Sequence, residues 1–435
     1  MLIATNREAA SAGSAMSGEV LPSGTPPTPP IQVGPARLVN SDAEVGNTRV
    51  PKGEGSPAPL VTRLILEDFR SYATVDLTVS GRLVALVGEN GVGKTNLMEA
   101  LSLLAPGRGL RRAELSEMAR RPGPGSFAIS SALDTPHGEH RLGVGLALPD
   151  PDGRASRVFR IDGVNAASPA AFAEYVRVIW LTPDLDFLFR GPAGERRRFL
   201  DRLVLAVDAA HGARVGGLER ALRSRNRVLE ESPGDMLWLD ALEREVAELA
   251  VAVAAARRET VERLASLILA TLDNASPFPF ASLILKGEID DLVAALPAVD
   301  AEDRYRAVLR SGRARDRAVG RTLVGPQASD LLVRHGPKDL PADTCSTGEQ
   351  KALLIGLILA HARLVAAMSG IAPLVLLDEI AAHLDPRRRG ALFEALEALG
   401  GQVWMTGADP ALFADLKGRA DVVEIQPGLA RRASA

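Results

Sequence analysis

A short glycine-rich segment carries the residue types needed to hold phosphate groups. It follows the apolar run Leu83–Val87, which has the composition of a buried strand, and it precedes a helical pattern at 96–104. Glycines let backbone N–H groups curl around an anion, and a helix start adds positive potential. We therefore predict a nucleoside-triphosphate loop with the spacing G-x-x-x-x-G-K-[ST], rather than an ordinary glycine turn. Its residues are Gly88, Glu89, Asn90, Gly91, Val92, Gly93, Lys94 and Thr95.

Two carboxylates at the end of a second apolar run supply the remaining chemistry. We expect Lys94 to pair with the β- and γ-phosphates of ATP and the Thr95 hydroxyl to bind Mg²⁺. The run Leu374–Leu377 ends in Asp378 and Glu379. Asp378 is expected to hold Mg²⁺ through water, and Glu379 to polarise the attacking water as a general base. Adjacent acids at a strand end are often only solvated, but together with the phosphate loop they predict ATP hydrolysis.

The string Ser346-Thr347-Gly348-Glu349-Gln350 opens the apolar stretch that precedes these acids. It resembles the signature of ATPases in which each subunit completes the active site of its partner. Ser346 and Gly348 would then cover the γ-phosphate bound to a second copy, and ATP would join the two copies. The alternative is a capping box, with Ser346 as N-cap and Glu349 three residues on. Both can hold, because a helix N-terminus also attracts phosphate.

Four further residues are candidates for the nucleotide site. Asp385 lies in a loop expected to cross the dimer interface, or it caps the helix that begins at Pro386. Thr406 follows an apolar strand at the place where such proteins sense the γ-phosphate. Arg70 or Tyr72, just upstream of the phosphate loop, is expected to contact the adenine or the phosphates; the alternative is a surface strand end.

The elements that must position these residues form an α/β head interrupted by helices. Alternating and apolar runs at 126–164 predict an antiparallel β lobe, and long charged Ala/Leu-rich segments after 192 predict helices. We expect an ABC-type P-loop ATPase head with an antiparallel β lobe and an inserted helical arm. The predicted parts are a disordered extension (1–58), the first half of the head (59–204), the arm (205–318) and the second half of the head (319–435).

Composition narrows the class of protein without identifying a partner. The chain has 435 residues, a formal net charge of -3 and one cysteine, which excludes an intrachain disulfide framework. No secretory signal is visible, and His361 and Arg363 interrupt the apolar stretch 352–368, so we interpret it as a buried helix. We expect a cytoplasmic protein with no membrane partner.

Local clusters of arginine are the candidates for binding DNA phosphates. The first is Arg108, Arg111 and Arg112, after the phosphate-loop helix. A second cluster spans 196–198, where Glu195 and Asp201 predict ion pairing, and a third lies at 310–317. The alternative for each cluster is a solvated or salt-bridged face.

The chain resembles the RecF family of bacterial recombination and repair ATPases, relatives of the SMC heads, over about residues 60–427. The ordered segments that carry the resemblance are FRSY (69–72), GENGVGKTNLMEAL (88–101), GRGLRR (107–112), ERRRFLD (195–201), GRTLVGP (320–326), STGEQKALL (346–354), LLDEIAAHLD (376–385) and TGAD (406–409).

The resemblance implies an ATP-dependent homodimer that binds gapped or single-stranded DNA, notably at junctions with duplex. It also implies RecO and RecR partners, loading of the RecA recombinase, replication-fork recovery, SOS induction after DNA damage, and slow, DNA-stimulated ATP hydrolysis used as a switch. One departure is visible: where the family usually has His-Arg-Asp-Asp, this chain has Gln327-Ala328-Ser329-Asp330.

Two other classes share the nucleotide motifs. An ATPase subunit of a membrane transporter should lack the arm, and an SMC-like tether should carry a much longer one. The intermediate length of the arm favours the RecF type.

Overall fold

The structure is a computed structural model that describes residues 58–147, 157–273 and 275–432. The chain divides into two units, 1–53 and 54–435, and all that follows concerns the second. The predicted disordered extension thus lies, apart from residue 58, outside the described residues, as does part of the predicted β lobe, at 148–156.

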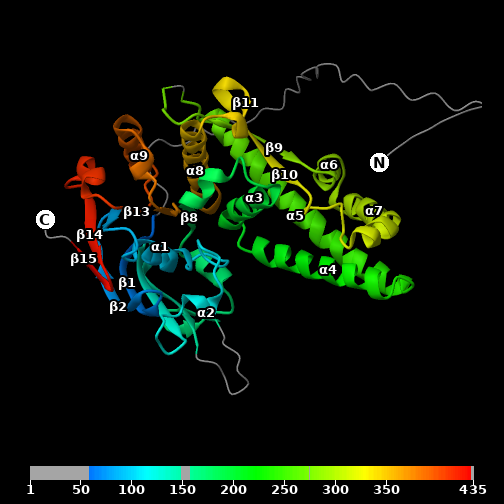
Figure 1. Cartoon of the computed structure of the whole chain (residues 1–435), viewed down its shortest axis with the longest axis horizontal. Helices are drawn as coiled ribbons and strands as arrows, with labels where there is room; N and C mark the ends of the chain where they lie inside the picture. Colours follow the sequence, from blue (N-terminus) through cyan, green and yellow to red (C-terminus); the bar gives the residue numbers. More distant parts are fainter. Residues whose placement is uncertain (1–57, 148–156, 274, 433–435) are drawn as a thin grey trace, which may run out of the picture. The chain divides into compact units, whose positions relative to one another are not determined.

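A mainly parallel sheet forms the centre of the head (Figure 1). Its inner strands are buried along their whole length, which explains why they are continuous apolar runs without alternation. Within this sheet, only the described strand nearest the C-terminus pairs antiparallel with its neighbour. In spatial order the strands are β15 (Leu429–Arg432), β14 (Ala420–Gln426), β3 (Leu83–Val87), β13 (Val403–Gly407), β12 (Leu374–Leu377) and β8 (Val178–Leu181).

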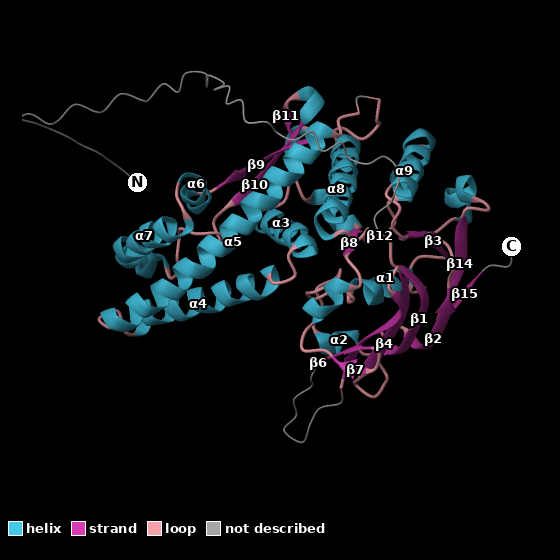
Figure 2. Cartoon of the chain, turned by 180° about the vertical axis from the view of Figure 1, so that it is seen from behind, coloured by secondary structure: helices cyan, strands magenta, loops and turns pink. Residues whose placement is uncertain are grey.

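The predicted antiparallel lobe is a second sheet, in which all neighbouring strands run antiparallel (Figure 2). Residues on one face, such as Leu64, Leu66 and Ile129, are buried against the parallel sheet and the first helix, whereas their neighbours are half-buried or exposed. In spatial order the strands are β2 (Tyr72–Thr78), β1 (Leu60–Phe69), β4 (Phe127–Thr135), β5 (Gly138–Leu146), β6 (Arg157–Ile161) and β7 (Val164–Asn165).

Helices cover both faces of the parallel sheet. Helix α1 (Lys94–Ser102) packs between the two sheets, while α3 (Ala193–Val207), α8 (Thr347–Ser369) and α9 (Pro386–Ala398) share a core on the opposite face. The short α2 (Leu115–Met118) follows α1 in the chain. Among the described residues, α8 alone is long and apolar enough to cross a membrane, yet most of that stretch is buried inside the protein. It is a core helix, as its interrupting His361 predicted.

The inserted segment is a helical arm with a core of its own. Helix α5 packs along α4, α6 and α7, and Ala247, Ala250 and Ala254 allow close approach at their contact. The arm helices are α4 (His211–Glu231), α5 (Met236–Ala270), α6 (Glu288–Ala295) and α7 (Ala298–Val319).

One element inside the arm segment differs from the prediction of helices alone. Residues Ala281–Lys286 form strand β9, which pairs with β10 (Asp330–His335) and, through it, with β11 (Leu340–Pro341). The sequence analysis assigned the region to helices because its partner strand lies about fifty residues away, and local patterns do not report such pairing.

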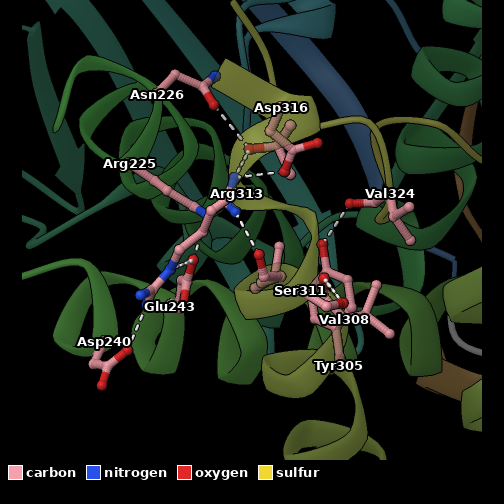
Figure 3. A network of polar contacts seen from close by, with 12 residues as sticks. Arg225, Asn226, Asp240, Glu243, Tyr305, Val308, Ser311, Arg313, Asp316 and Val324 are labelled. Atoms are coloured by element: carbon pink, nitrogen blue, oxygen red, sulfur yellow. Dashed lines mark hydrogen bonds and ion pairs between the residues drawn. The ribbon is translucent and has the colours of Figure 1, made fainter. Parts of the chain in front are cut away.

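A buried polar network joins the arm helices to the segment that re-enters the head (Figure 3). Arg225 of α4 is fully buried and donates to Glu243 of α5 (3.0 Å), Asp316 of α7 (2.8 Å) and the hydroxyl of Thr322 (2.7 Å). The Tyr305 hydroxyl donates to the carbonyl oxygen of Val324. The guanidinium thus satisfies partners on three elements, which fixes the return of the chain to the head.

Candidate nucleotide site

The phosphate loop lies at the carboxyl end of β3 and runs directly into α1. Gly91 and Gly93 have φ values of 86° and 118°, which side chains with a Cβ rarely adopt. A Cβ on Gly93 would also lie 2.6 Å from the hydroxyl oxygen of Tyr72. The glycines therefore permit both the backbone path and the close packing, and the loop has the form expected of a phosphate cradle.

Lys94 is almost completely buried at the start of α1. Its ammonium donates to the carbonyl oxygens of Gly88 (2.7 Å) and Glu89 (2.8 Å), so its charge lies within the curve of the loop. Burial lowers the pKa of Lys94, and the negative charges of Glu379 and Asp378 oppose that effect. A buried ammonium satisfied only by carbonyl dipoles is well suited to pairing with phosphate oxygens.

Asp378 meets the phosphate loop through hydroxyl groups on two sides. The Thr95 hydroxyl lies 3.1 Å from one carboxylate oxygen of Asp378, and the Thr406 hydroxyl donates to the other at 2.7 Å. The Thr406 hydroxyl also accepts from the backbone N–H of Glu379 (2.8 Å). This convergence follows from the sheet order, because β13 lies between β3 and β12, so the three carboxyl ends are neighbours.

The electrostatics of Asp378 fit a cation. Burial raises its pKa, hydrogen bonds from Thr406 and Thr95 lower it, and the charge of Glu379 raises it further. Thr95 and Asp378 offer hard oxygen ligands, which Mg²⁺ prefers, and too few to form a complete cage. No cluster of three or more His, Cys, Asp or Glu side chains suited to a metal occurs within the described ranges. The donor set therefore fits an ion that is completed by phosphate oxygens and water.

The signature segment is an exposed helix start, and the capping box is present. Ser346 is the N-cap of α8, its hydroxyl accepts from the N–H of Glu349, and the Glu349 carboxylate accepts from the N–H of Ser346 (2.9 Å). Ser346 and Gly348 are both exposed. The cap and the composite-site interpretation are compatible, since the capped helix end faces solvent.

Two basic residues near that helix start had not been identified from the sequence. Lys338, in the turn after β10, forms an ion pair with Glu349. Arg388 of α9 lies 3.9 Å from the position that a Cβ on Gly348 would occupy. Neither belongs to a motif, and only the packing of β10 and α9 beside α8 brings them there.

The remaining candidates occupy different surroundings. Asp385 caps α9 by accepting from the N–H of Arg388 (2.9 Å), as its alternative interpretation predicted. The guanidinium of Arg70 is bound to the buried carboxylate of Glu99 (2.6 and 2.8 Å) and to the carbonyl oxygen of Glu117. Tyr72, the other candidate in that segment, is fully buried.

The first arginine cluster is divided among three environments. Arg108 pairs with Glu114, and Arg111 donates to Asn96 (2.7 Å) and to Glu99 (3.0 Å). Arg111 is also close enough to Asp378 to lower the pKa of that carboxyl group. Arg112 is exposed, in a left-handed conformation (φ 55°). The loop 107–112 thus borders the nucleotide site.

The other two clusters are mostly paired. Arg196 binds Asp330 (2.7 Å), and Arg197 donates to the carbonyl oxygen of Ser329 (2.7 Å). Arg310 and Arg313 pair with Asp240 on the arm. The expected pairing of the second cluster with Glu195 is present through Arg198, whereas Asp201 pairs with Arg257 and His211.

Together the parallel sheet, the phosphate loop, the paired acids and the signature helix define an ABC-type ATPase head of the kind found in SMC proteins. The family model for the RecF/RecN/SMC N terminal domain matches residues 60–427. This chain belongs to that family, and within it to the RecF proteins.

Named relatives agree with this assignment. The chain is 51% identical over 368 residues to the DNA replication and repair protein RecF of Mesorhizobium japonicum, covering 85% of this chain and 96% of that protein. It is 52% identical over 369 residues to the RecF protein of Brucella abortus (strain 2308), covering 85% and 95%.

The fold also matches solved structures. A structure of the recombination mediator protein RecF with ATP in the RecFOR pathway aligns with a TM-score of 0.74 at 18% identity, over 87% of this chain and 98% of that one. A second, designated RecF-ATPrS, aligns with a TM-score of 0.75, over 87% and 100%. At this identity the likeness concerns the fold.

Proposed function

We propose that this protein is an ATP-binding DNA replication and repair protein in which ATP-driven dimerisation gates binding to gapped or single-stranded DNA. The observation that carries the proposal is the convergence of Thr95, Asp378 and Thr406 at adjacent strand ends, beside a buried Lys94. The names of the relatives support the repair role, and the ATP-bound fold neighbour supports the nucleotide.

Within one subunit, each residue of the site has a separate task. Lys94 and the loop N–H groups hold the β- and γ-phosphates, and Thr95 and Asp378 hold Mg²⁺, which supplies positive charge to the phosphate oxygens. The Thr406 hydroxyl fixes the Asp378 carboxylate and the Glu379 backbone relative to each other. Glu379 takes a proton from the water that attacks the γ-phosphate, so the rate of hydrolysis depends on the position of its carboxylate.

A second copy completes the site. Ser346 and Gly348 at the exposed start of α8 donate to the γ-phosphate held by the partner, and Asp385 lies at the interface. Neither subunit alone encloses the nucleotide, so ATP stabilises the dimer, and hydrolysis releases it. The dimer in turn presents Arg108, Arg111 and Arg112 to DNA.

The cellular role follows from the family. Dimers on gapped DNA would recruit mediators of the RecO and RecR type, support recombinase loading and fork recovery, and thereby contribute to SOS induction. This work takes place in the cytoplasm. DNA contact near Arg111 would stimulate hydrolysis because Arg111 lies close to Asp378.

The decisive experiment follows dimerisation and DNA binding in parallel. Lys94→Ala should abolish ATP-dependent dimerisation in gel filtration and the ATP-dependent part of binding to gapped DNA. Lys417→Ala, which removes an exposed lysine elsewhere on the head, serves as the matched control. Normal dimerisation of Lys94→Ala with ATP would refute the mechanism.

A further inference from the structure

The peptide unit that leads into the signature helix is held on both of its edges. Its carbonyl oxygen, on Cys345, accepts from Nη2 of Arg190 (2.9 Å) and from Nε2 of Gln350 (2.8 Å). Its N–H group, on Ser346, donates to the Glu349 carboxylate (2.9 Å). Because a peptide unit is planar, fixing the C=O on one edge and the N–H on the other sets its orientation. The direction in which the Ser346 side chain leaves the backbone is thereby set as well.

Arg190 and Gln350 also share a second acceptor. Nε of Arg190 donates to the carbonyl oxygen of Asp343 (3.2 Å), and Nε2 of Gln350 donates to the same oxygen (3.3 Å). Gln350 belongs to α8 itself, so its contacts are local. Arg190 comes from a segment 155 positions before Cys345, and its planar guanidinium spans the two carbonyls. Arg190 is thus the contact that ties this peptide unit to a distant part of the head.

The segment that carries Arg190 is anchored in the head. Leu188 and Phe189, directly before it, are buried in the core that contains α3 and α8. A few residues earlier, Asp186 pairs with the buried Lys351 of α8 (3.1 Å). The backbone at Arg190 is therefore fixed relative to α8, although the Arg190 side chain itself is exposed.

An exact orientation matters at this end of α8 because its donors face solvent. Ser346 and Gly348 are exposed, and the first N–H groups of a helix have no partners within it. Donors that stabilise a phosphate must already point at its oxygens, since reorienting them during binding or reaction costs free energy. A rotation of the peptide unit before Ser346 would turn its hydroxyl away from such a phosphate.

We propose that Arg190 is a positioning residue for the signature. By holding the Cys345 carbonyl, it aims Ser346 and the start of α8 at the γ-phosphate bound to the partner subunit. The inference rests on the proposed function, in which a second copy completes the site. Arg190 then acts in trans, on the nucleotide of the partner, and leaves the nucleotide held by its own subunit unaffected.

The first test compares two methionine variants of the full chain. Arg190→Met keeps most of the length of the side chain and removes its donors. ATP-dependent hydrolysis per subunit should fall about tenfold, the effect of losing a hydrogen bond from a charged donor. Arg419→Met is the matched control, because Arg419 is also exposed and also donates to a backbone carbonyl, that of Asp415 (2.6 Å). It should leave hydrolysis unchanged.

A second measurement guards against a merely structural effect. Separate Arg190→Met subunits should bind ATP with the affinity of the wild type, measured by fluorescence of a labelled ATP analogue at protein concentrations too low for dimers. Arg190→Lys retains a charged donor that reaches one carbonyl but not both, so it should recover part of the rate.

Mixed dimers separate an action in trans from an action on the subunit's own nucleotide. Arg190→Met subunits are mixed with an excess of Glu379→Gln subunits, which keep the signature and lack the proposed base. In a mixed dimer the nucleotide held by Arg190→Met meets an intact signature, so single-turnover hydrolysis should return to the rate of the same mixture made with wild-type subunits. Lys94→Ala in the same mixture should stay inactive, because its own phosphate loop is lost.

An unrestored rate in the mixture, unchanged hydrolysis by Arg190→Met alone, or a loss of ATP affinity in its separate subunits would each overturn the role in trans. Failure of the proposed function looks different. The wild-type rate per subunit would then not rise with subunit concentration, and the inference would fall together with the composite site.

Discussion

Thr95 and Asp378 are 283 positions apart in the chain, and yet the Thr95 hydroxyl lies 3.1 Å from a carboxylate oxygen of Asp378. Thr95 lies in the first turn of α1, shortly after β3, and Asp378 directly follows β12, so their meeting is a product of strand order. Burial of the Asp378 carboxylate without a cation is unfavourable, which is expressed in its raised pKa. A group kept under these conditions is positioned for function rather than for stability.

We therefore expect Asp378→Asn to have opposite effects on stability and activity. The amide keeps the shape and carries no charge to be buried, so the nucleotide-free protein should melt at a higher temperature near neutral pH. Because an acid with a raised pKa in the fold costs stability as pH rises through that pKa, the advantage should shrink as the pH is lowered. ATP hydrolysis should fall at least a hundredfold. Calorimetric scans at several pH values and a Mg²⁺ titration of the ATPase rate test both parts.

Substitutions of Thr406 test how much stability comes from the hydroxyl that links Asp378 to the Glu379 backbone. Thr406→Val keeps the shape but leaves the N–H of Glu379 without its acceptor, which should cost about 1–3 kcal/mol in urea unfolding. Thr406→Ser keeps the hydroxyl and should retain most of the stability and the ATPase activity. Equal stability of the valine and serine variants would show that the hydrogen bond is unimportant.

Several parts of the fold could be predicted because their signals are local. The buried strands before Gly88 and Asp378, the capping box at Ser346 and the long helices of the arm each depend on neighbouring residues. Other features depend on contacts between distant segments. The Arg70–Glu99 pair, strand β9 and the pairing of Arg225 with Asp316 have no local signature, because each is defined by what another element places beside it.

The altered segment 327–330 illustrates the same limit. Read alone, Gln327-Ala328-Ser329-Asp330 is only a departure from the family pattern. In the fold Gln327 donates to the carbonyl oxygens of Thr322 and Val324, and Asp330 pairs with Arg196. These contacts hold the segment that joins the arm to the head in place.

Glu379→Gln should trap the closed dimer. The amide cannot take a proton from the attacking water, whereas nucleotide binding by Lys94 and Thr95 is retained. We expect dimers that survive gel filtration after free ATP is removed, with hydrolysis reduced by about 10² to 10⁴. A dimer lifetime equal to that of the wild type would exclude Glu379 as the base.

The network around Arg225 should dominate the stability of the arm. Arg225→Met removes the 2.8 Å partner of the buried Asp316 carboxylate and leaves the buried Glu243 carboxylate with Arg313 alone, which should lower the free energy of unfolding by about 3–5 kcal/mol. Arg310→Gln breaks an exposed pair with Asp240 and should cost less than about 1 kcal/mol. Urea unfolding compares the two, and hydrogen exchange should show the extra opening of Arg225→Met in α4, α5 and α7. Similar losses of unfolding free energy in both variants would contradict the expectation that the buried ion pairs contribute more stability than the exposed one.

The ion pair between Lys338 and Glu349 should determine the pH at which the capping box at the start of α8 is lost. Lys338 and the Ser346 hydrogen bonds lower the pKa of Glu349 to about 2. Since a carboxylate with a depressed pKa stabilises the fold above its usual pKa and loses that effect as pH falls toward the lowered value, the capping box should persist well below pH 4. Lys338→Ala should raise the pKa of Glu349 and move the loss of the cap to higher pH, whereas Lys417→Ala should leave it unchanged. NMR titration of the Glu349 carboxyl carbon measures the shift directly, and an unaltered pKa in Lys338→Ala would show that the cap alone holds the carboxylate charged.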